Sequence, residues 1–347
     1  MRAMALRLAL ALIALLPGAA PAQEAVASFG AGATRMVLRS TTDIAIIAPV
    51  IERFVERNPD LSVSYEQWGS NDLFDDSRAA CDGRRAPADA VFSSAAHQMV
   101  WLVNAACAQS HVSAATGALP PTRRWRDELW GITEEPAAIV YNTAAFAGQD
   151  VPHDRFALLD LMRADPDLLR GRIATYDIAA SGLGYLFAHA DSLEATTFGA
   201  MLEAFARVGA VATCCSAEII EGVAEGRFLI AYNVLGSYVA NRQSQAVGII
   251  LPEDYTLVLS RSYMIPRGAA HPEAARRLLD FLLSDEAQRI LERIGLLLPR
   301  DGAETGLLPS APRAIALAPP LLVALDGHAR RRLFGLWEDA FRPAQLP

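Results

Sequence analysis

Lysine is absent from this 347-residue chain, and all 31 of its basic residues are arginine. The absence excludes three kinds of site that need a lysine side chain: the P-loop for phosphate, the Schiff-base centre and the Ser–Lys catalytic pair. The formal net charge is −8, and it becomes −10 when Arg2 and Arg7 near the N-terminus are left out. An acidic chain of this kind is not expected to bind nucleic acid or an anionic membrane surface.

Catalytic motifs are missing as well. The chain holds neither G-x-S-x-G nor H-E-x-x-H, and no third glycine completes the pattern begun by Gly30 and Gly32. Glu134 and Glu135 are adjacent on an expected strand, so their side chains point to opposite faces and at most one can enter a site. We therefore expect a protein that is not an enzyme and needs no metal or cofactor. Only a catalytic group assembled from distant parts of the chain stays open.

Long apolar runs are confined to the N-terminus. Residues 1–22 combine two arginines, an apolar run over 6–16 and small residues at 20–22, which is the order of a secretory signal peptide. The run is too short to span a bilayer, and its cleavage region has no cysteine for lipid attachment. We expect export to the periplasm as a soluble monomer.

Cysteine is scarce, with four residues in the chain. In an oxidising compartment an even number favours disulfides over reactive thiols. We expect Cys81–Cys107 as the first pairing, because these residues flank neighbouring elements. Cys214 and Cys215 could form a vicinal disulfide, pair elsewhere or stay reduced. No cysteine spacing typical of a zinc site is present.

A strand, a polar turn and a helix follow one another early in the chain. The apolar run 36–38 leads towards a segment that repeats apolar residues at helical spacing over 47–55. Between them lie four polar residues, Ser40, Thr41, Thr42 and Asp43. A helix start has unpaired N–H groups and partial positive charge, so it suits an anion or a hydroxylated ligand. The same residues could equally serve as a helix cap and nothing more.

The strand–helix order recurs twice more before residue 107. Strands are expected over 61–65 and 88–92, and the second ends at Ser93 and Ser94. Such alternation predicts an α/β fold with a parallel sheet covered by helices, in which ligands gather at the carboxyl ends of the strands. Arg39, on the first strand, either adds charge to such a site or forms a salt bridge at its rim.

A second α/β half begins with a strand expected over 137–142 and continues to residue 254. Small polar residues again follow its strand ends and precede its helices. The candidate site residues of this half are Tyr176, Ser181, Gly182, Asn233 and Ser237. Tyr176, like Tyr232, also fits a role as a core or rim aromatic, and Asn233 and Ser237 also fit turn and cap roles.

The last part of the chain returns towards the first half. A strand is expected over 255–263, including Tyr263, and amphipathic helices follow over 271–283 and from residue 284 onwards. A turn and a short strand are expected over 295–300. One terminal helix is expected over 331–341.

Several segments together resemble one family, the periplasmic solute-binding proteins of ABC transporters, in the branch that includes ferric-ion-binding proteins. The most specific is segment 271–288, which begins His-Pro-Glu-Ala-Ala. Other matching pairs are Asn58-Pro59, Trp130-Gly131 and Tyr141-Asn142. Within the branch, segments 38–43 and 231–238 look most like the phosphoglycerate transport regulatory protein and its relatives.

This resemblance implies a type II-like fold with two α/β lobes, two hinge crossings and a helical C-terminal tail. Residues 35–137 would form the first lobe and 138–254 the second, while 255–347 would return to the first lobe and end in helices. The ligand would lie in a cleft between the lobes, held by the polar residues at the strand ends. Glu135 and Tyr263 would lie near the crossings.

The resemblance also implies a function, the capture of a small molecule for an ABC transporter permease. Ferric-binding members usually place two adjacent tyrosines late in the second lobe, whereas this chain has Tyr232-Asn233 and then Tyr238. We therefore favour a phosphorylated or carboxylated organic anion as the ligand. A periplasmic sensor that docks on a histidine kinase is the main alternative. A ferric-ion-binding protein and a hydrolase on the same frame are the lesser ones.

Overall fold

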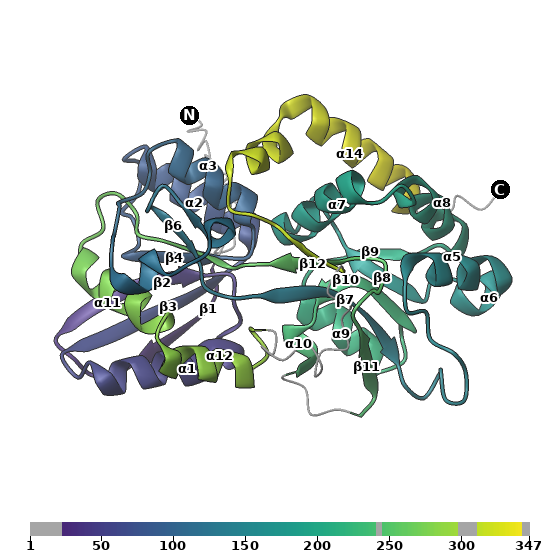
Figure 1. Ribbon diagram of the computed structural model, residues 1–347, viewed down its shortest axis with the longest axis horizontal. Helices are drawn as coiled ribbons and strands as arrows, with labels where there is room; N and C mark the ends of the chain where they lie inside the picture. The colour runs from purple at the N-terminus through teal and green to yellow at the C-terminus, as the bar shows by residue number, and fades with distance from the viewer. Residues whose placement is uncertain (1–22, 241–244, 298–310, 342–347) are drawn as a thin grey trace, which may run out of the picture.

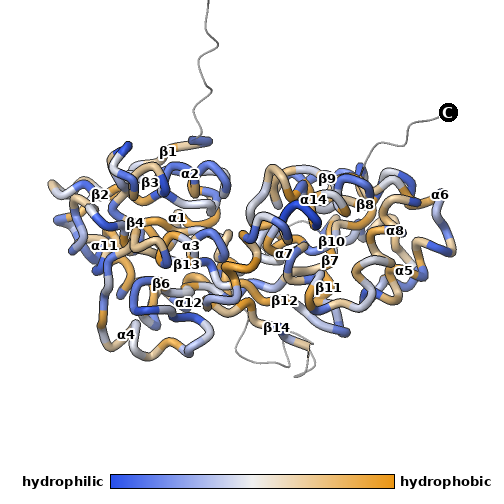
Figure 2. Tube along the Cα trace, turned by 90° about the horizontal axis from the view of Figure 1, so that it is seen from above, coloured by the Kyte–Doolittle hydropathy of each residue, from blue (hydrophilic) through white to orange (hydrophobic). Residues whose placement is uncertain are grey.

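The computed structural model describes residues 23–240, 245–297 and 311–341, and it has two α/β lobes, each built on its own sheet (Figure 1). The strand order is β1-β3-β2-β4-β13-β6-β5 in the first sheet and β14-β12-β7-β10-β8-β9 in the second, where β11 also pairs with β7. Seen from above, the lobes are separate bodies joined at their middle, close to β12 (Figure 2). The expected two-lobe α/β fold is confirmed.

Lobe 1 contains the first strand–helix units and the strand that returns late in the chain. Its elements are β1 (Gln23–Phe29), β2 (Thr34–Ser40), α1 (Ile44–Arg57), β3 (Leu61–Trp68), α2 (Ser70–Cys81), β4 (Ala90–Ser93), α3 (Ala96–Asn104), α4 (Ala114–Gly117), η1 (Pro121–Arg123), β5 (Arg124–Trp125), β6 (Leu129–Gly131), β13 (Ser262–Met264), α11 (Pro272–Leu282) and α12 (Asp285–Arg293). Strands β2, β3 and β4 are parallel, so their carboxyl ends meet at one edge.

Helix α1 shows why the sequence folds in this way. Its apolar stripe is buried, and Val50 and Phe54 are completely enclosed. Burial of each such side chain contributes about 1.5–3 kcal/mol. Pro49 lies in the second turn of this helix, where its missing N–H removes one helical hydrogen bond, and the buried stripe offsets this cost. The stripe thus fixes α1 against the sheet and places its N-terminus at the edge where β2 ends.

Lobe 2 has the same design with a mixed sheet. Its elements are β7 (Glu135–Asn142), α5 (Arg155–Ala164), α6 (Pro166–Leu169), β8 (Ile173–Tyr176), α7 (Gly182–Glu194), α8 (Phe198–Val208), β9 (Val211–Thr213), α9 (Ser216–Ala224), β10 (Ile230–Leu235), α10 (Ser237–Ala240), β11 (Val247–Ile250), β12 (Thr256–Leu259), β14 (Pro312–Ala314), η2 (Pro319–Leu325) and α14 (Gly327–Phe341). Strands β8, β9 and β10 are parallel, and β7 runs antiparallel to β10.

The lobes are joined by two neighbouring crossings. One runs from β6 to β7 and the other from β12 to β13, and the two strands that enter lobe 2 pair antiparallel, with Leu259 opposite Glu135. Next to this pair, the Ser260 hydroxyl donates to the carbonyl of Thr133 at 2.6 Å. The prediction of a single strand over 255–263 is therefore wrong. The chain changes sheets at 260–261, because β12 pairs within lobe 2 and only β13 joins the first sheet.

The C-terminal tail differs from the expected return to lobe 1. Strand β14 pairs parallel with β12, and α14 packs against α8, where it buries Leu333 and Trp337 in the apolar core of lobe 2 (Figure 1). Between these two elements, η2 contacts α3 of lobe 1, and the Leu317 N–H donates to the Thr122 carbonyl at 2.8 Å. The tail thus contacts both lobes. Part of the turn and strand expected over 295–300 lies outside the described residues.

Two disulfides are present. Cys81–Cys107 joins the end of α2 to the segment after α3, as expected, and Cys214–Cys215 takes the vicinal form that was one of three alternatives. Across residues 23–240, 245–297 and 311–341, no helix combines the length and the apolar character that a membrane span requires.

Candidate ligand-binding cleft

A cavity of about 310 Å³ lies between the lobes, where strands of both sheets end. Its described wall carries hydroxyl, carboxylate and aromatic groups from lobe 1 and lobe 2, and an arginine from the second crossing. The main lining residues are Glu24, Thr41, Asp43, Gln67, Trp68, Ser70 and Ser94 of lobe 1, Tyr176, Ser181, Cys214, Cys215, Ser216, Glu218 and Tyr238 of lobe 2, and Arg261. Five residues expected from the sequence are among them: Thr41, Asp43, Ser94, Tyr176 and Ser181.

In lobe 1 the two hydroxyl turns meet, as their strand ends predicted. The Ser94 N–H donates to Thr41 Oγ1 at 2.9 Å, and the two hydroxyl oxygens are 3.1 Å apart. Asp43 stands at the N-cap of α1, but its side chain makes no capping hydrogen bond. Its Oδ1 instead accepts from the Tyr238 hydroxyl of lobe 2 at 3.0 Å. The turn therefore presents polar groups to the cleft and does more than cap the helix.

In lobe 2 the wall forms where β8 and β9 end side by side. The Tyr176 and Ser216 hydroxyl oxygens are 2.5 Å apart, and the Leu235 N–H donates to the same tyrosine oxygen at 3.3 Å. Burial raises the pKa of Tyr176 to about 12 and raises the pKa of Tyr238 far above its usual value. Both phenols are therefore neutral at physiological pH and act as hydrogen-bond donors or acceptors.

Among the residues that the structure describes, Arg261 is the only basic one that lines the cavity, and it is 1% exposed. Its Nε donates to Glu135 Oε1 at 2.8 Å and its Nη1 to Thr42 Oγ1 at 3.0 Å. Burial alone would lower the pKa of Arg261, but the Glu135 carboxylate together with Tyr238 and Tyr65 raises it, and the net effect is a raised pKa. The Ser237 hydroxyl donates to Glu135 Oε2 at 2.7 Å. Glu135, Thr42 and Ser237 thus hold the arginine and do not line the cavity themselves.

Five further residues expected at the site do not line the cavity. Ser40 and Ser93 form local turns, because their hydroxyls accept from the N–H groups of Thr42 and Ala95 at 3.0 and 3.2 Å. The Tyr263 hydroxyl donates to the Ala275 carbonyl at 2.8 Å, on the lobe 1 side of its strand. Ser40 and Ser93 are thus turn residues, and Tyr263 belongs to the core of lobe 1.

Asn233 points away from the cleft, into a buried network around Arg155. Its Nδ2 donates to Asp191 Oδ2 at 2.6 Å, and its backbone takes a φ of +52°, in the left-handed region that asparagine tolerates. Arg155 is fully buried and donates to the Tyr232 hydroxyl at 2.7 Å. Tyr232 is therefore part of the lobe 2 core and is not available to a ligand.

The lobes contact each other directly around the cleft. The Gly182 N–H donates to Ser70 Oγ at 2.8 Å, and Asn71 Nδ2 donates to the carbonyls of Ala179 and Ala180 at 2.9 and 3.1 Å. Gly182, expected as a ligand contact, is therefore an interlobe contact. A Cβ at Gly182 would lie 2.8 Å from Gln98 Nε2, so a larger residue at this position would require the end of the Gln98 side chain to move.

Several residues of the cleft were missed from the sequence. Arg261 is the most important, and its signal was available, since it is the only basic residue in the apolar return segment 255–263. Glu24, in contrast, lies on β1, which follows the expected signal peptide and had no recognisable pattern. Arg39 does not reach the cavity. It forms ion pairs with Glu66 and Asp76 at 2.8 and 2.7 Å, and a salt bridge was one of the two roles expected for it from the sequence.

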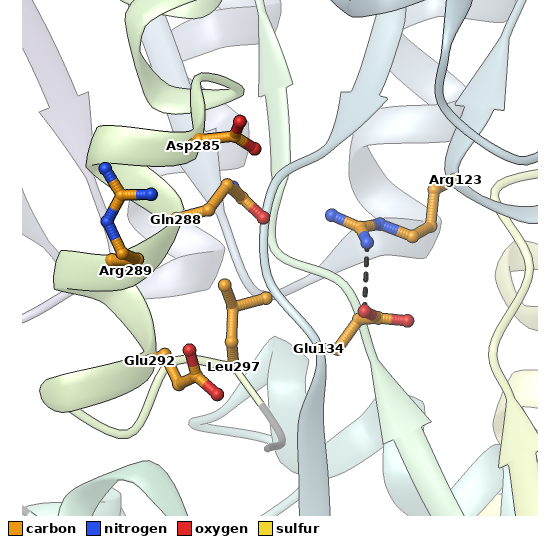
Figure 3. Close-up of a pocket in the computed structure, with 7 residues that line it drawn as sticks. All are labelled: Arg123, Glu134, Asp285, Gln288, Arg289, Glu292 and Leu297. Atoms are coloured by element: carbon orange, nitrogen blue, oxygen red, sulfur yellow. Dashed lines mark ion pairs between the residues drawn. The ribbon is translucent and has the colours of Figure 1, made fainter. Parts of the chain in front are cut away.

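A second hollow of about 480 Å³ lies beside the first crossing, between that crossing and α12 (Figure 3). Arg123 and Glu134 form an ion pair of 3.0 Å on one side of it, and Asp285, Arg289 and Glu292 of α12 add charges of both signs on the other (Figure 3). Gln288 Nε2 donates to the Leu282 carbonyl at 2.7 Å. Because none of the described residues that line this hollow comes from a strand end of lobe 2, we regard the interlobe cavity as the ligand site.

Comparisons with known proteins agree with this geometry. The family model described as bacterial extracellular solute-binding protein matches residues 39–289. A substrate-binding protein of an ABC transporter from Agrobacterium tumefaciens is 34% identical, with a TM-score of 0.86 over 93% of this chain and 100% of that chain. No curated protein sequence matched.

More distant structures share the fold. The periplasmic binding protein AfuA from Actinobacillus pleuropneumoniae, with fructose-6-phosphate bound, has a TM-score of 0.70 at 15% identity, over 90% of this chain and 100% of that chain. Iron-bound HitA from Pseudomonas aeruginosa has a TM-score of 0.65 at 18% identity, over 88% and 99%. On the family model and the 34% identical structure together, the chain belongs to the bacterial extracellular solute-binding proteins of ABC transporters.

Proposed function

We propose that this binding protein captures a small organic anion, phosphorylated or carboxylated, in the interlobe cavity and delivers it to an ABC transporter in the periplasm. The observation that carries this proposal is Arg261. A charged guanidinium that is 1% exposed and lines the cavity is a preorganised partner for an anion. The hydroxyls of Ser94, Tyr176 and Ser216 supply further hydrogen bonds to anionic oxygens.

The cavity also holds three carboxylates, Glu24, Asp43 and Glu218. Carboxylates accept hydrogen bonds and repel a second anion, so they favour a ligand that carries hydroxyl groups beside its anionic group. A volume of about 310 Å³ suits a metabolite of this kind. The fructose-6-phosphate in the distant structure of AfuA has both features.

Ferric ion fits the cavity less well. This ion favours phenolate and carboxylate oxygens, and the hydroxyls of the two described cavity tyrosines are already engaged within the protein, Tyr176 with Ser216 and Tyr238 with Asp43. Tyr232 is bound within the Arg155 network. Among the described residues no group of three or more His, Cys, Asp or Glu side chains is placed to hold a metal ion.

Closure of the lobes is the mechanism we propose. The ligand bridges groups of both lobes, and it stabilises the closed form only through contacts that are better there than in an open form. The contacts of Ser70 with Gly182 and of Asp43 with Tyr238 exist only while the lobes meet. The permease would then recognise the closed arrangement.

The test is mass spectrometry of the ligand that co-purifies with the secreted protein, followed by a thermal-shift screen. The screen compares 3-phosphoglycerate, fructose 6-phosphate and citrate with ferric ion and glucose. Binding of at least one anion should raise the melting temperature by mass action on the folded form. A clear response to ferric ion or glucose, with none to any anion, would refute the anion assignment.

A further inference from the structure

The Cys214–Cys215 disulfide lies in the wall of the ligand cavity. Both cysteines line the cavity on the short segment between β9 and α9, and Cys215 is exposed to it. The other disulfide, Cys81–Cys107, does not line the cleft, and Cys107 is 4% exposed in the apolar core of lobe 1. The two disulfides therefore differ in two respects. Cys214–Cys215 can affect the ligand site, and it is the more accessible of the two to a reductant.

Cys215 has an unusual backbone for its residue type. Its φ is +50°, in the left-handed region that a residue with a Cβ rarely adopts. A disulfide between neighbouring residues closes a small ring through the peptide that joins them, and this ring limits the conformations open to both residues. Without the ring, a non-glycine residue at this position would be expected to leave the left-handed region.

The backbone of Cys215 sets the start of α9. Cys215 is the N-cap residue, and its carbonyl accepts the first hydrogen bond of the helix, from the Ile219 N–H at 3.1 Å. Its side chain makes no capping hydrogen bond, so only its backbone conformation fixes the first turn. Ser216, the next residue, meets the Tyr176 hydroxyl at the cavity wall. A change at Cys215 is thus transmitted directly to two residues that line the site.

We propose that the Cys214–Cys215 disulfide is a positioning element of the ligand site, which holds the first turn of α9 in its binding geometry and makes ligand affinity depend on oxidation of this bond. A dithiol reductant would donate two electrons and two protons to the S–S bond, giving two cysteine thiols and its own cyclic disulfide. Cys215 would then relax, and Ser216 would lose its place against Tyr176. The expected effect on ligand affinity rests on the proposed function, whereas the expected effect on the first turn of α9 does not.

Three variants separate the possibilities. Cys214→Ser/Cys215→Ser removes the ring, and Cys214→Ser/Cys215→Gly removes it but supplies a residue that adopts positive φ without a steric penalty. Cys81→Ser/Cys107→Ser is the control, because it removes a disulfide that does not line the cavity. Affinity is measured by calorimetry with fructose 6-phosphate, 3-phosphoglycerate and citrate. We expect the serine pair to bind about tenfold more weakly, equivalent to about 1.4 kcal/mol, the glycine pair to recover part of this loss, and the control to stay within about threefold of the wild type.

A second measurement needs no ligand. Amide hydrogen exchange at Ile219 reports on the hydrogen bond to the Cys215 carbonyl, and it should be faster in the serine pair and in dithiothreitol-treated protein than in the oxidised wild type. Unchanged exchange in the serine pair would overturn the proposal, whatever the ligand. The proposal is also overturned if the serine pair and the glycine pair both bind weakly while amide exchange at Ile219 is unchanged. The sulfur atoms would then act by direct contact with the ligand. If the wild type binds none of the three probes, the anion assignment fails, and hydrogen exchange still decides the role of the disulfide.

Discussion

Variants that lack the Arg261 side chain should show separately what it contributes to the stability of the protein and to ligand binding. Arg261→Met leaves the Glu135 carboxylate without its ion-pair partner at a position that is 0% exposed. Loss of one member of a buried pair typically costs about 3–5 kcal/mol, because the remaining charge is uncompensated. This is a large part of the roughly 5–15 kcal/mol that a folded domain has in total.

The double variant Arg261→Met/Glu135→Gln gives the sharper result. It removes both charges. Thr133 donates to Oε1 of Glu135 and Ser237 donates to Oε2, both at 2.7 Å, so the oxygen of a glutamine can accept from one hydroxyl while its NH2 group donates to the oxygen of the other. Neutral replacement of a whole buried pair is often nearly without cost, so we expect the double variant to recover about 2 kcal/mol or more of the loss. Both variants should lose the thermal response to ligand, since both lack the guanidinium.

Urea denaturation, followed by fluorescence and by circular dichroism, measures these free energies. The control is Arg276→Met, whose partner Glu273 is 76% exposed and whose ion pair should contribute less than about 1 kcal/mol. If Arg261→Met costs no more than the control, or if the double variant is as unstable as the single one, then Arg261 and Glu135 do not form the buried pair described here.

Three other outcomes are expected. Phe54→Ala, which empties a fully enclosed position in α1, should cost about 3–5 kcal/mol in urea denaturation. Tyr238→Phe removes the hydrogen bond to Asp43 between the lobes, so small-angle scattering should show a more open protein and calorimetry a weaker affinity. Burial lowers the pKa of His97 from 6.5 to about 3, with smaller effects from His189 and Arg330. As the pH falls, the unfolded chain therefore takes up a proton on His97 at a higher pH than the folded protein does. The free energy of unfolding should fall by up to about 1.4 kcal/mol per pH unit between about pH 6.5 and 3. His97→Phe should reduce this slope.

The sequence was most informative where periodicity and strand ends coincide. The apolar stripe of α1 and the hydroxyl turns at Thr41 and Ser94 follow from local pattern, and parallel strands then bring the two turns together. Tyr176 and Ser181 were found by the same rule in lobe 2. Each of these residues lies at the end of a central parallel strand or at the start of the next helix. This position alone predicted that the residue lies near the cleft.

Residues whose positions depend on tertiary contacts could not be predicted in this way. Asn233 follows the rule for strand ends, yet its side chain turns into the Arg155 network, which is assembled from segments up to 100 residues apart. Arg261 lies between two strands that belong to different sheets, so no local periodicity identifies it. The vicinal disulfide could not be chosen over its alternatives, because the pairing of cysteines depends on which of them the fold brings together.

The C-terminal tail has a consequence for the energetics of opening. The hinge strands cross between the lobes, and η2 adds a separate contact by packing on α3 while α14 stays fixed to α8. The Tyr185 hydroxyl donates to the Ala324 carbonyl and ties this short helix to α7 as well. A rotation of the lobes that separates η2 from α3 therefore exposes the apolar surface between them. The resting balance between the open and closed forms is thus set partly by a segment that never touches the ligand, and changes in tail sequence can tune affinity while every residue of the cavity stays the same.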